Sequence, residues 1–303
     1  MSTLPYRDFN GALRERFGCR VQKITLDAGL TCPNRDGTLG TGGCIYCNER
    51  GSGTGAASRL SISDQIRDAK QYLARRYKAR AFIAYFQSFS NTYAPLQVLR
   101  SLYEEALADP DIVGLSIGTR PDCVEDAVLD MLAGYCGSHW IWLEYGLQSA
   151  HDETLIGIGR GHSVAQFADA VRRTRRRGLS ICAHVILGLP GEGREEMLAT
   201  ARYLAESDIQ AVKIHLLYVI RGTVLDAWHG SGRYRCLTRD EYVSLVSEFL
   251  TVLPPEMIVQ RLTGDPHPDE LVAPAWALEK RRNIEAIHRF MAARGLYQGK
   301  ACS

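Results

Sequence analysis

Short apolar runs alternate with longer amphipathic stretches between residue 21 and about residue 217. The apolar runs are rich in β-branched and aromatic residues and have the length of buried strands. Strands are therefore predicted at Val21–Leu26, Ala81–Phe86, Val113–Gly118, Ile141–Gly146, Ile181–Leu187 and Val212–Leu217. Helices are predicted between them at Ser63–Tyr77, Pro95–Ala108, Cys123–Tyr135, Val164–Arg177 and Glu195–Glu206.

This alternation predicts βαβ units and a parallel sheet covered by helices on at least one face, so the fold class is α/β. Periodicity alone does not choose between a barrel and an open, doubly wound sheet. After Leu217 the pattern changes, and a Gly-rich irregular stretch is followed by further elements. These are a helix at Arg239–Val252, a strand at Met257–Leu262 and a long helix at Asp269–Arg294.

Three parts of the chain are predicted from this organisation. Residues 1–19 form an amino-terminal segment, residues 20–220 form the α/β barrel, and residues 221–303 form a small α/β extension that covers the barrel mouth. A chain of 303 residues with 46% hydrophobic content can bury a substantial core. No signal peptide or membrane-spanning run stands out, so we expect a cytoplasmic protein with no membrane partner.

The charge balance does not by itself require a nucleic-acid partner, because the formal net charge is only +2. Basic residues do cluster at 75–80 and 172–177. Both clusters fall in the last turn of a predicted helix, where cations complement the helix dipole. A solvated helix end is the favoured interpretation, and a phosphate-binding patch is the alternative.

Three cysteines, Cys32, Cys44 and Cys47, lie in the stretch CPNRDGTLGTGGCIYC directly after the first predicted strand. Thiolates select zinc, copper(I) or iron-sulfur clusters, and three of them leave one coordination position for another ligand. A structural zinc site would need a fourth ligand, for which Cys19 is the one candidate near the loop. An iron-sulfur cluster with one open iron is therefore favoured over zinc.

The three cysteines, with Tyr46 just before the third, resemble the signature of the radical S-adenosylmethionine (SAM) superfamily. The long first gap is similar to that of the catalytic subunit of Elongator and of the short bacterial YhcC/YtqA-type proteins, which have no acetyltransferase domain. The resemblance implies a partial (βα)6 barrel that holds a [4Fe-4S] cluster on the three cysteines, with SAM on the open iron.

Further motifs follow the later strands and extend this resemblance. The ExGxQS block contains Glu144 and Gln148, and Arg160 follows it. The resemblance implies that Gln148 and Arg160 contact SAM, with the guanidinium meeting the SAM carboxylate. Glu144, on a buried strand, is predicted to be held by a nearby base such as Arg120 or to be protonated. A purely structural ion pair is the alternative role for Glu144.

The remaining candidate SAM-binding residues lie after the second strand and around the fifth. Gln87 and Asn91 occupy the place of the family's glycine-rich segment, although this chain lacks those glycines. His184 corresponds to a position that faces the SAM ribose, and Gly188 begins a GLPGE turn that resembles the adenine-binding turn. Near the carboxyl end, the polar loop around Asp265 is predicted to contact the substrate.

The resemblance implies that a reduced cluster cleaves SAM to a 5′-deoxyadenosyl radical, which takes a hydrogen atom from the substrate. An electron donor such as flavodoxin or ferredoxin is then expected. The leading substrate prediction is the side chain of a wobble uridine in tRNA, and a small metabolite is the competitor. Two other possibilities are ordinary methyl transfer and a zinc-bound, non-catalytic RNA-binding protein.

Overall fold

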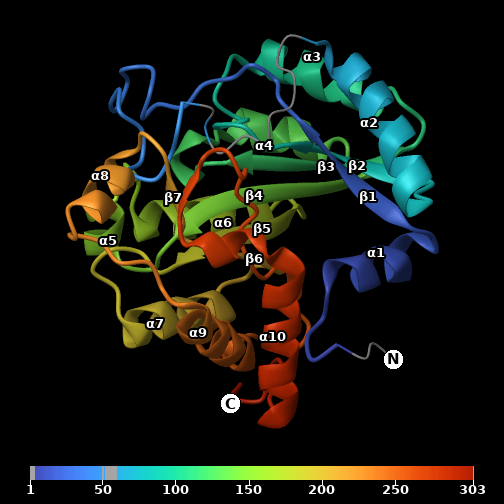
Figure 1. Ribbon diagram of the computed structural model, residues 1–303. Helices are drawn as coiled ribbons and strands as arrows, with labels where there is room; N and C mark the ends of the chain where they lie inside the picture. Colours follow the sequence, from blue (N-terminus) through green and yellow to red (C-terminus); the bar gives the residue numbers. More distant parts are fainter. Residues whose placement is uncertain (1–3, 50, 52–59, 303) are drawn as a thin grey trace.

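A computed structural model describes residues 4–49, 51 and 60–302. Its main sheet is curved and parallel, and the helices lie around it (Figure 1). The strands, in their order across the sheet, are β1 (Val21–Leu26), β2 (Ala81–Phe86), β3 (Ile112–Thr119), β4 (Trp140–Gln148), β5 (Ser180–Leu187), β6 (Ala211–Leu216) and β8 (Ile258–Arg261). A separate antiparallel pair joins β7 (Val219–Ile220) to β9 (Leu271–Ala273).

The helices connect the strands or follow them, and many begin at a side chain that caps their first turn. They are α1 (Phe9–Phe17), α2 (Ile62–Tyr77), α3 (Leu96–Leu107), η1 (Pro121–Cys123), α4 (Asp126–Ala133), α5 (Asp152–Gly157), α6 (Val164–Arg175), α7 (Arg194–Glu206), α8 (Val224–Gly230), α9 (Arg239–Val252), η2 (Ala275–Leu278) and α10 (Lys280–Ala293). Ser163 and Thr238 form capping boxes at the starts of α6 and α9. No helix in the described ranges is long and apolar enough to cross a lipid bilayer.

The predicted parallel α/β sheet is confirmed, and β8 extends it from six strands to seven. Two predicted helices are wrong in part. The helix expected at Asp269–Arg294 begins only at Lys280, because Pro274 disfavours helical backbone before it and the preceding residues pair with β7 as β9. The helix expected at Cys123–Tyr135 is interrupted at Val124, which is extended and buried in the core.

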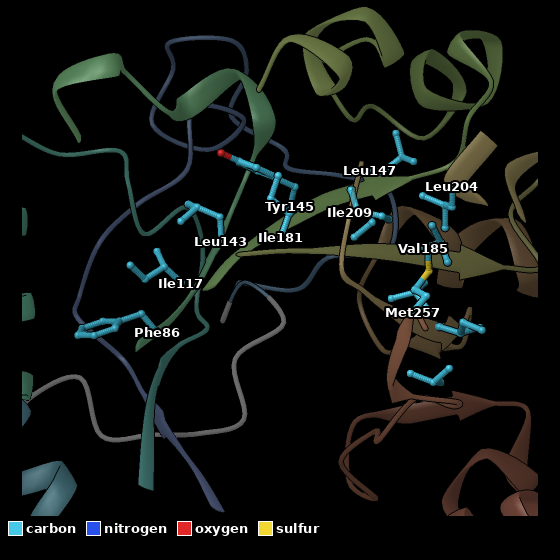
Figure 2. Close-up of a cluster of buried hydrophobic side chains, with 14 of the residues drawn as sticks. Phe86, Ile117, Leu143, Tyr145, Leu147, Ile181, Val185, Leu204, Ile209 and Met257 are labelled. Carbon is cyan, nitrogen blue, oxygen red and sulfur yellow. The ribbon is translucent and has the colours of Figure 1, made fainter. Parts of the chain in front are cut away.

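The strands alternate between an apolar outer face and a polar inner face. In β4, Leu143, Tyr145 and Leu147 pack outward in the main hydrophobic core (Figure 2), whereas Glu144 and Gln148 line an inner cavity. Leu204 of α7 belongs to the same core. Because both faces are buried, the strands read as almost continuous apolar runs in the sequence, and the few polar residues within them mark the inner face.

Helix α1 closes the end of the barrel at which the strands begin. Its Ala12 belongs to one apolar cluster with Trp142, Cys182, Ala211 and Ile258, which lie near the amino ends of their strands. Apolar contacts thus close the cavity at the amino ends of the strands, and the cavity opens at their carboxyl ends.

Residues from opposite ends of the sequence meet beside this apolar cluster around Ala12. The backbone of Asp8 forms a parallel bridge with Val259 of β8. The Gln298 side chain accepts a hydrogen bond from the Arg7 amide at 2.8 Å and donates to the carbonyls of Pro254 and Met257 at 2.6 and 2.7 Å. One glutamine near the carboxyl end therefore joins the segment before α1 to the segment before β8.

The basic cluster at residues 172–177 is paired with acidic side chains. Arg173 lies 3.0 Å from Asp126, and Arg175 lies 3.1 Å from Asp208. These exposed pairs favour the first interpretation of the cluster, a solvated helix end, over a phosphate-binding patch.

Candidate active site at the carboxyl ends of the strands

A cavity of about 690 Å³ opens at the carboxyl ends of the strands, within the size range of small-molecule sites. Cys32, Cys44 and Cys47 all line it. Cys44 is buried, and the other two are partly exposed. Cys19 precedes β1 and packs near the amino ends of the strands, so it cannot join these three thiols.

The cysteine loop is held in shape by its own backbone and by Arg35. The Arg35 amide donates to the Cys32 carbonyl at 2.8 Å, and the Cys47 amide donates to the Cys44 carbonyl at 2.9 Å. The Arg35 guanidinium donates to the Cys47 carbonyl at 2.8 Å. A Cβ at Gly43 would lie 2.8 Å from this guanidinium, and Gly43 has a φ of 72°, so only glycine fits the turn.

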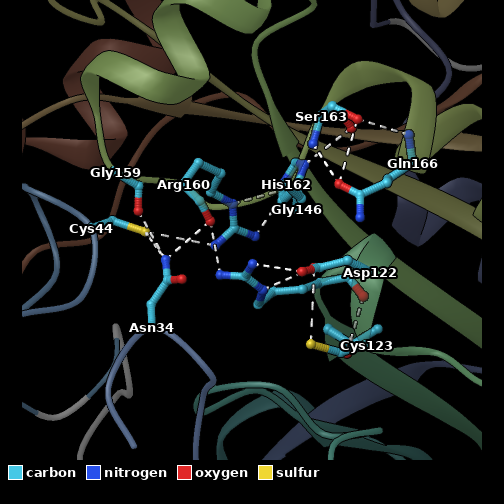
Figure 3. A network of polar contacts seen from close by, with 12 residues as sticks. Asn34, Cys44, Asp122, Cys123, Gly146, Gly159, Arg160, His162, Ser163 and Gln166 are labelled. Atoms are coloured by element: carbon cyan, nitrogen blue, oxygen red, sulfur yellow. Dashed lines mark hydrogen bonds and ion pairs between the residues drawn. The ribbon is translucent and has the colours of Figure 1, made fainter. Parts of the chain in front are cut away.

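Two N–H groups point at the Cys44 sulfur (Figure 3). Asn34 Nδ2 lies 3.7 Å from Cys44 Sγ, and Arg160 Nη1 lies 3.8 Å from it. Both groups can donate a hydrogen bond to a sulfur that is bound to a metal. Three thiols in one cavity, one of them facing N–H donors, fit an iron-sulfur cluster, and no fourth cysteine in the described ranges lines this cavity.

Arg160 reaches Cys44 because it is anchored to the end of β4. Its Nη2 donates to the Gly146 carbonyl at 3.0 Å, and His162 Nε2 lies 2.9 Å from the same oxygen. A Cβ at Gly146 would lie 2.4 Å from Arg160 Nη2 and 2.6 Å from Gln148 Nε2. Gln148 itself has a φ of 73°, a strained value for a residue with a side chain. The ExGxQS block and Arg160 therefore form one packed unit.

Arg120 is not the partner of Glu144, so that prediction is wrong. Its guanidinium instead makes a two-pronged ion pair with Asp122, at 2.9 and 2.7 Å. It also donates to the Arg160 carbonyl at 2.8 Å. The physical reason is proximity, because Asp122 is only two residues away and points back along the turn. Arg120 thus lines the cavity with its charge already paired.

Glu144 is held by bases from three other strands. Its carboxylate accepts short hydrogen bonds from Lys23 of β1 and Lys213 of β6, and His184 Nε2 of β5 lies 2.7 Å away. Burial alone would raise the pKa of Glu144, but Lys213 and Lys23 hold it well below its usual range. Glu144 is therefore ionised, as the first of the two predicted alternatives required.

The sequence contains a signal for the two lysines, which were not predicted as partners of Glu144. Lys23 is the one charged residue in the apolar run VQKITL, and Lys213 is the one in AVKIHL. A charge in the middle of a strand buried on both faces needs a partner. Single charged residues in β1, β4 and β6 therefore indicate an ion-pair layer inside the barrel, where the curved sheet brings these non-adjacent strands together.

The other predicted SAM-binding residues lie at different distances from the cavity. Tyr46 and Gln87 line it. Asn91 is fully buried, and its Nδ2 donates to the Gly118 carbonyl at 2.9 Å, so it stabilises the loop after β2 from behind. Gly188 has a φ of 94° in the turn after β5 and does not line the cavity.

The carboxy-terminal loop at 263–270 forms part of the cavity wall. Asp265 and His267 line the cavity, as does Glu270. Asp265 is paired with Lys280 of α10 at 2.6 Å, and Glu270 accepts a hydrogen bond from Asn48 at 3.0 Å. The second contact links this loop to the cysteine loop across the mouth of the cavity.

Buried neutral histidines make the chain less stable in acid. Burial lowers the pKa of His184 to about 4 and that of His162 to about 3. In the unfolded chain both titrate near pH 6.5, so between these values the unfolded state binds more protons and stability rises with pH. Each histidine contributes about 2 kcal/mol between pH 5 and pH 7, so we expect the cluster-free chain to be roughly 3–4 kcal/mol less stable at pH 5 than at pH 7. Urea unfolding at the two pH values measures this, and equal stability would contradict it.

Comparison with known protein families gives two matches that together cover most of the chain. Residues 36–204 match the radical SAM superfamily, and residues 209–293 match the radical SAM C-terminal domain. The uncharacterized protein YtqA of Bacillus subtilis is 43% identical over 296 residues, which are 97% of this chain and 92% of that protein.

Two further similarities concern part of the sequence or the fold. The tRNA uridine(34) acetyltransferase of Dehalococcoides mccartyi is 30% identical over 156 residues, which are 50% of this chain and 33% of that protein. The solved structure of Elp3 from Methanocaldococcus infernus superposes with a TM-score of 0.70 and 18% identity, over 92% of this chain and 64% of that one. The second similarity is one of fold.

Proposed function

Because the chain belongs to the radical SAM superfamily, we propose that it modifies the side chain of a wobble uridine in tRNA. Membership implies a [4Fe-4S] cluster and SAM. Cys32, Cys44 and Cys47 would hold the cluster, since these thiols meet in one cavity. When bound, cluster and SAM together supply the one-electron chemistry that removes a hydrogen atom from a substrate carbon. We propose flavodoxin or ferredoxin as the electron donor.

The observation that carries the catalytic part is the contact between Arg160 and Cys44. Arg160 lies beside the thiol and hydrogen-bonds the Gly146 carbonyl, so its buried positive charge faces the cavity without a carboxylate of its own among the described residues. A carboxylate of SAM would complete this pairing. Gln148 lies against the same glycine and would contact the same ligand.

The chain's own residues also shield the reaction from water. The link between Asn48 and Glu270 holds the carboxy-terminal loop against the cysteine loop. Helix α1 seals the opposite end with apolar side chains. A reactive intermediate in such an enclosed site is protected from quenching by solvent.

Support for a tRNA substrate comes from the relative that acts, by its name, on uridine 34 of tRNA. That similarity covers half of this chain. A small metabolite is the alternative, since the cavity is deep and has charged groups on its inner strands.

A complementation experiment tests the proposal. We expect one modified wobble uridine to be missing from the tRNA of a deletion strain, to return with the wild-type gene, and to stay missing with Cys44→Ala. Mass spectrometry of tRNA nucleosides measures this. The matched control is Cys136→Ser, which changes an exposed cysteine outside the cavity and should restore the nucleoside. An identical nucleoside profile in all strains would contradict the tRNA substrate.

A further inference from the structure

The wall of the cavity formed by β6 and β8 carries basic groups that the proposed SAM site does not use. Lys213 and His215 are two residues apart on β6 and so face the same side of the sheet. Arg261, at the end of β8, pairs in register with Lys213. His215 and Arg261 line the cavity, and Lys213 lies buried behind them.

Two of these groups lack partners in the described part of the chain. The Nε2 atom of His215 is buried and has no hydrogen bond. The Arg261 guanidinium makes no hydrogen bond or ion pair with any described side chain. A buried polar atom without a partner is costly, so such atoms are rare in folded proteins and often mark the place of a ligand.

The charge of this wall favours an anion. Glu144 is the one carboxylate in the ion-pair layer inside the barrel, and it is already paired with both Lys23 and Lys213. Arg261 therefore adds a positive charge that no carboxylate of the layer neutralises. Burial, followed by the charge of Arg261, lowers the pKa of His215 well below its usual range, so the ring is neutral and its Nε2 can carry a proton to donate.

Two acidic residues of the loop at 263–270 also line the cavity, and neither makes an ion pair with Arg261 among the described residues. Asp265 forms its ion pair with Lys280, and Glu270 accepts from Asn48. A metal cation is also disfavoured here. Glu144, Cys182 and His184 do present ligand atoms within 4.8 Å of one another, but two ammonium groups occupy the same carboxylate and would repel a cation.

We propose that Arg261 and His215 bind an anionic oxygen group of the substrate, a phosphate or a carboxylate, on the β6–β8 wall. This inference rests on the proposed function, since it places the substrate in the cavity that would also hold SAM. Arg261 would give two parallel N–H donors to the anion, and His215 would give a third. In a tRNA substrate the anion would be a backbone phosphate beside the modified nucleoside.

Anion titration tests the inference. Inorganic phosphate and, separately, acetate are titrated calorimetrically into the anaerobically reconstituted protein at low ionic strength. Saturating SAM is present so that the carboxylate site at Arg160 is filled. We expect saturable binding of one anion per chain, weakened about tenfold or more in Arg261→Met, the loss typical of a charge-assisted hydrogen bond. Arg289→Met, on the exposed face of α10, is the matched control and should bind as the wild type does.

The two ions distinguish the source of the anionic group. Tighter binding of phosphate indicates a phosphorylated substrate, and tighter binding of acetate indicates a carboxylate. Arg261→Lys, which keeps the charge, should retain part of the affinity, and its unfolding temperature shows whether the position tolerates change. Absence of binding by both ions, or unchanged binding in Arg261→Met, would overturn the inference.

SAM cleavage without substrate, measured on the same samples, separates this inference from the proposed function. A protein that cleaves SAM but binds neither ion contradicts only the anion site. A protein that binds phosphate through Arg261 but leaves tRNA nucleosides unchanged contradicts only the tRNA substrate.

Discussion

Replacing Cys44 with alanine is expected to abolish cluster binding and to lower the rate of SAM cleavage by more than about 100-fold. Removing a residue that only supports a metal ligand typically costs 10- to 100-fold, so loss of a ligand itself should cost more. Cys44 is the most buried of the three cysteines and faces both Asn34 and Arg160, so no neighbouring thiol can take its place. Iron and sulfide content, together with the yield of 5′-deoxyadenosine under reducing conditions, measure the effect.

The matched control for this experiment is Cys136→Ser. Cys136 is exposed and lies outside the cavity. The iron content of the Cys136→Ser protein and its rate of SAM cleavage should therefore equal those of the wild type. Zinc analysis of the same preparations tests the non-catalytic alternative. A colourless wild-type protein that carries stoichiometric zinc after anaerobic reconstitution would refute the radical mechanism.

Replacing Glu144 with glutamine is expected to lower the free energy of unfolding by about 3–5 kcal/mol, the usual cost of removing one partner from a buried ion pair. The carboxylate is fully buried and pairs with Lys23 and Lys213. Burial already lowers the pKa of Lys213 to about 7, so the variant leaves Lys23 without its carboxylate and makes Lys213 give up its proton. Urea unfolding at pH 7 measures the loss. The exposed change Glu153→Gln should stay within about 0.5 kcal/mol of the wild type.

A double variant separates the loss of charge balance from a loss of packing. Adding Lys213→Met to Glu144→Gln removes one of the two buried amino groups that have lost their carboxylate, so part of the lost stability should return. If the double variant is less stable than Glu144→Gln by the full cost of Lys213→Met alone, the two side chains are not coupled and the ion-pair account fails.

The sequence predicted the barrel well because the strands of a buried parallel sheet are apolar on both faces. The first two strands, VQKITL and AFIAYF, differ clearly from the helices, because the helices of this chain have one polar face. The motifs around Cys44 and Gln148 also predicted the superfamily correctly. Local sequence was enough here, because each motif lies within one loop at the end of one strand.

Partners that come from distant strands were not predictable in the same way. Glu144 pairs with Lys23 and Lys213, which are 121 and 69 residues away. Only the register of the sheet brings them together. Arg120 appeared to be a free base because the sequence does not show that Asp122 turns back toward it. The strand β9 was missed for the same reason, since β7 is its partner and lies far from it in the chain.

The contacts of Gln298 have a consequence for the order in which the chain assembles. A ribosome releases the amino-terminal helix first, and the Gln298 contacts to the Arg7 amide and the Pro254 carbonyl can form only after residue 298 has been synthesised. Until then the segment before α1 lacks this link to the segment before β8, so the contact between them is completed late in synthesis.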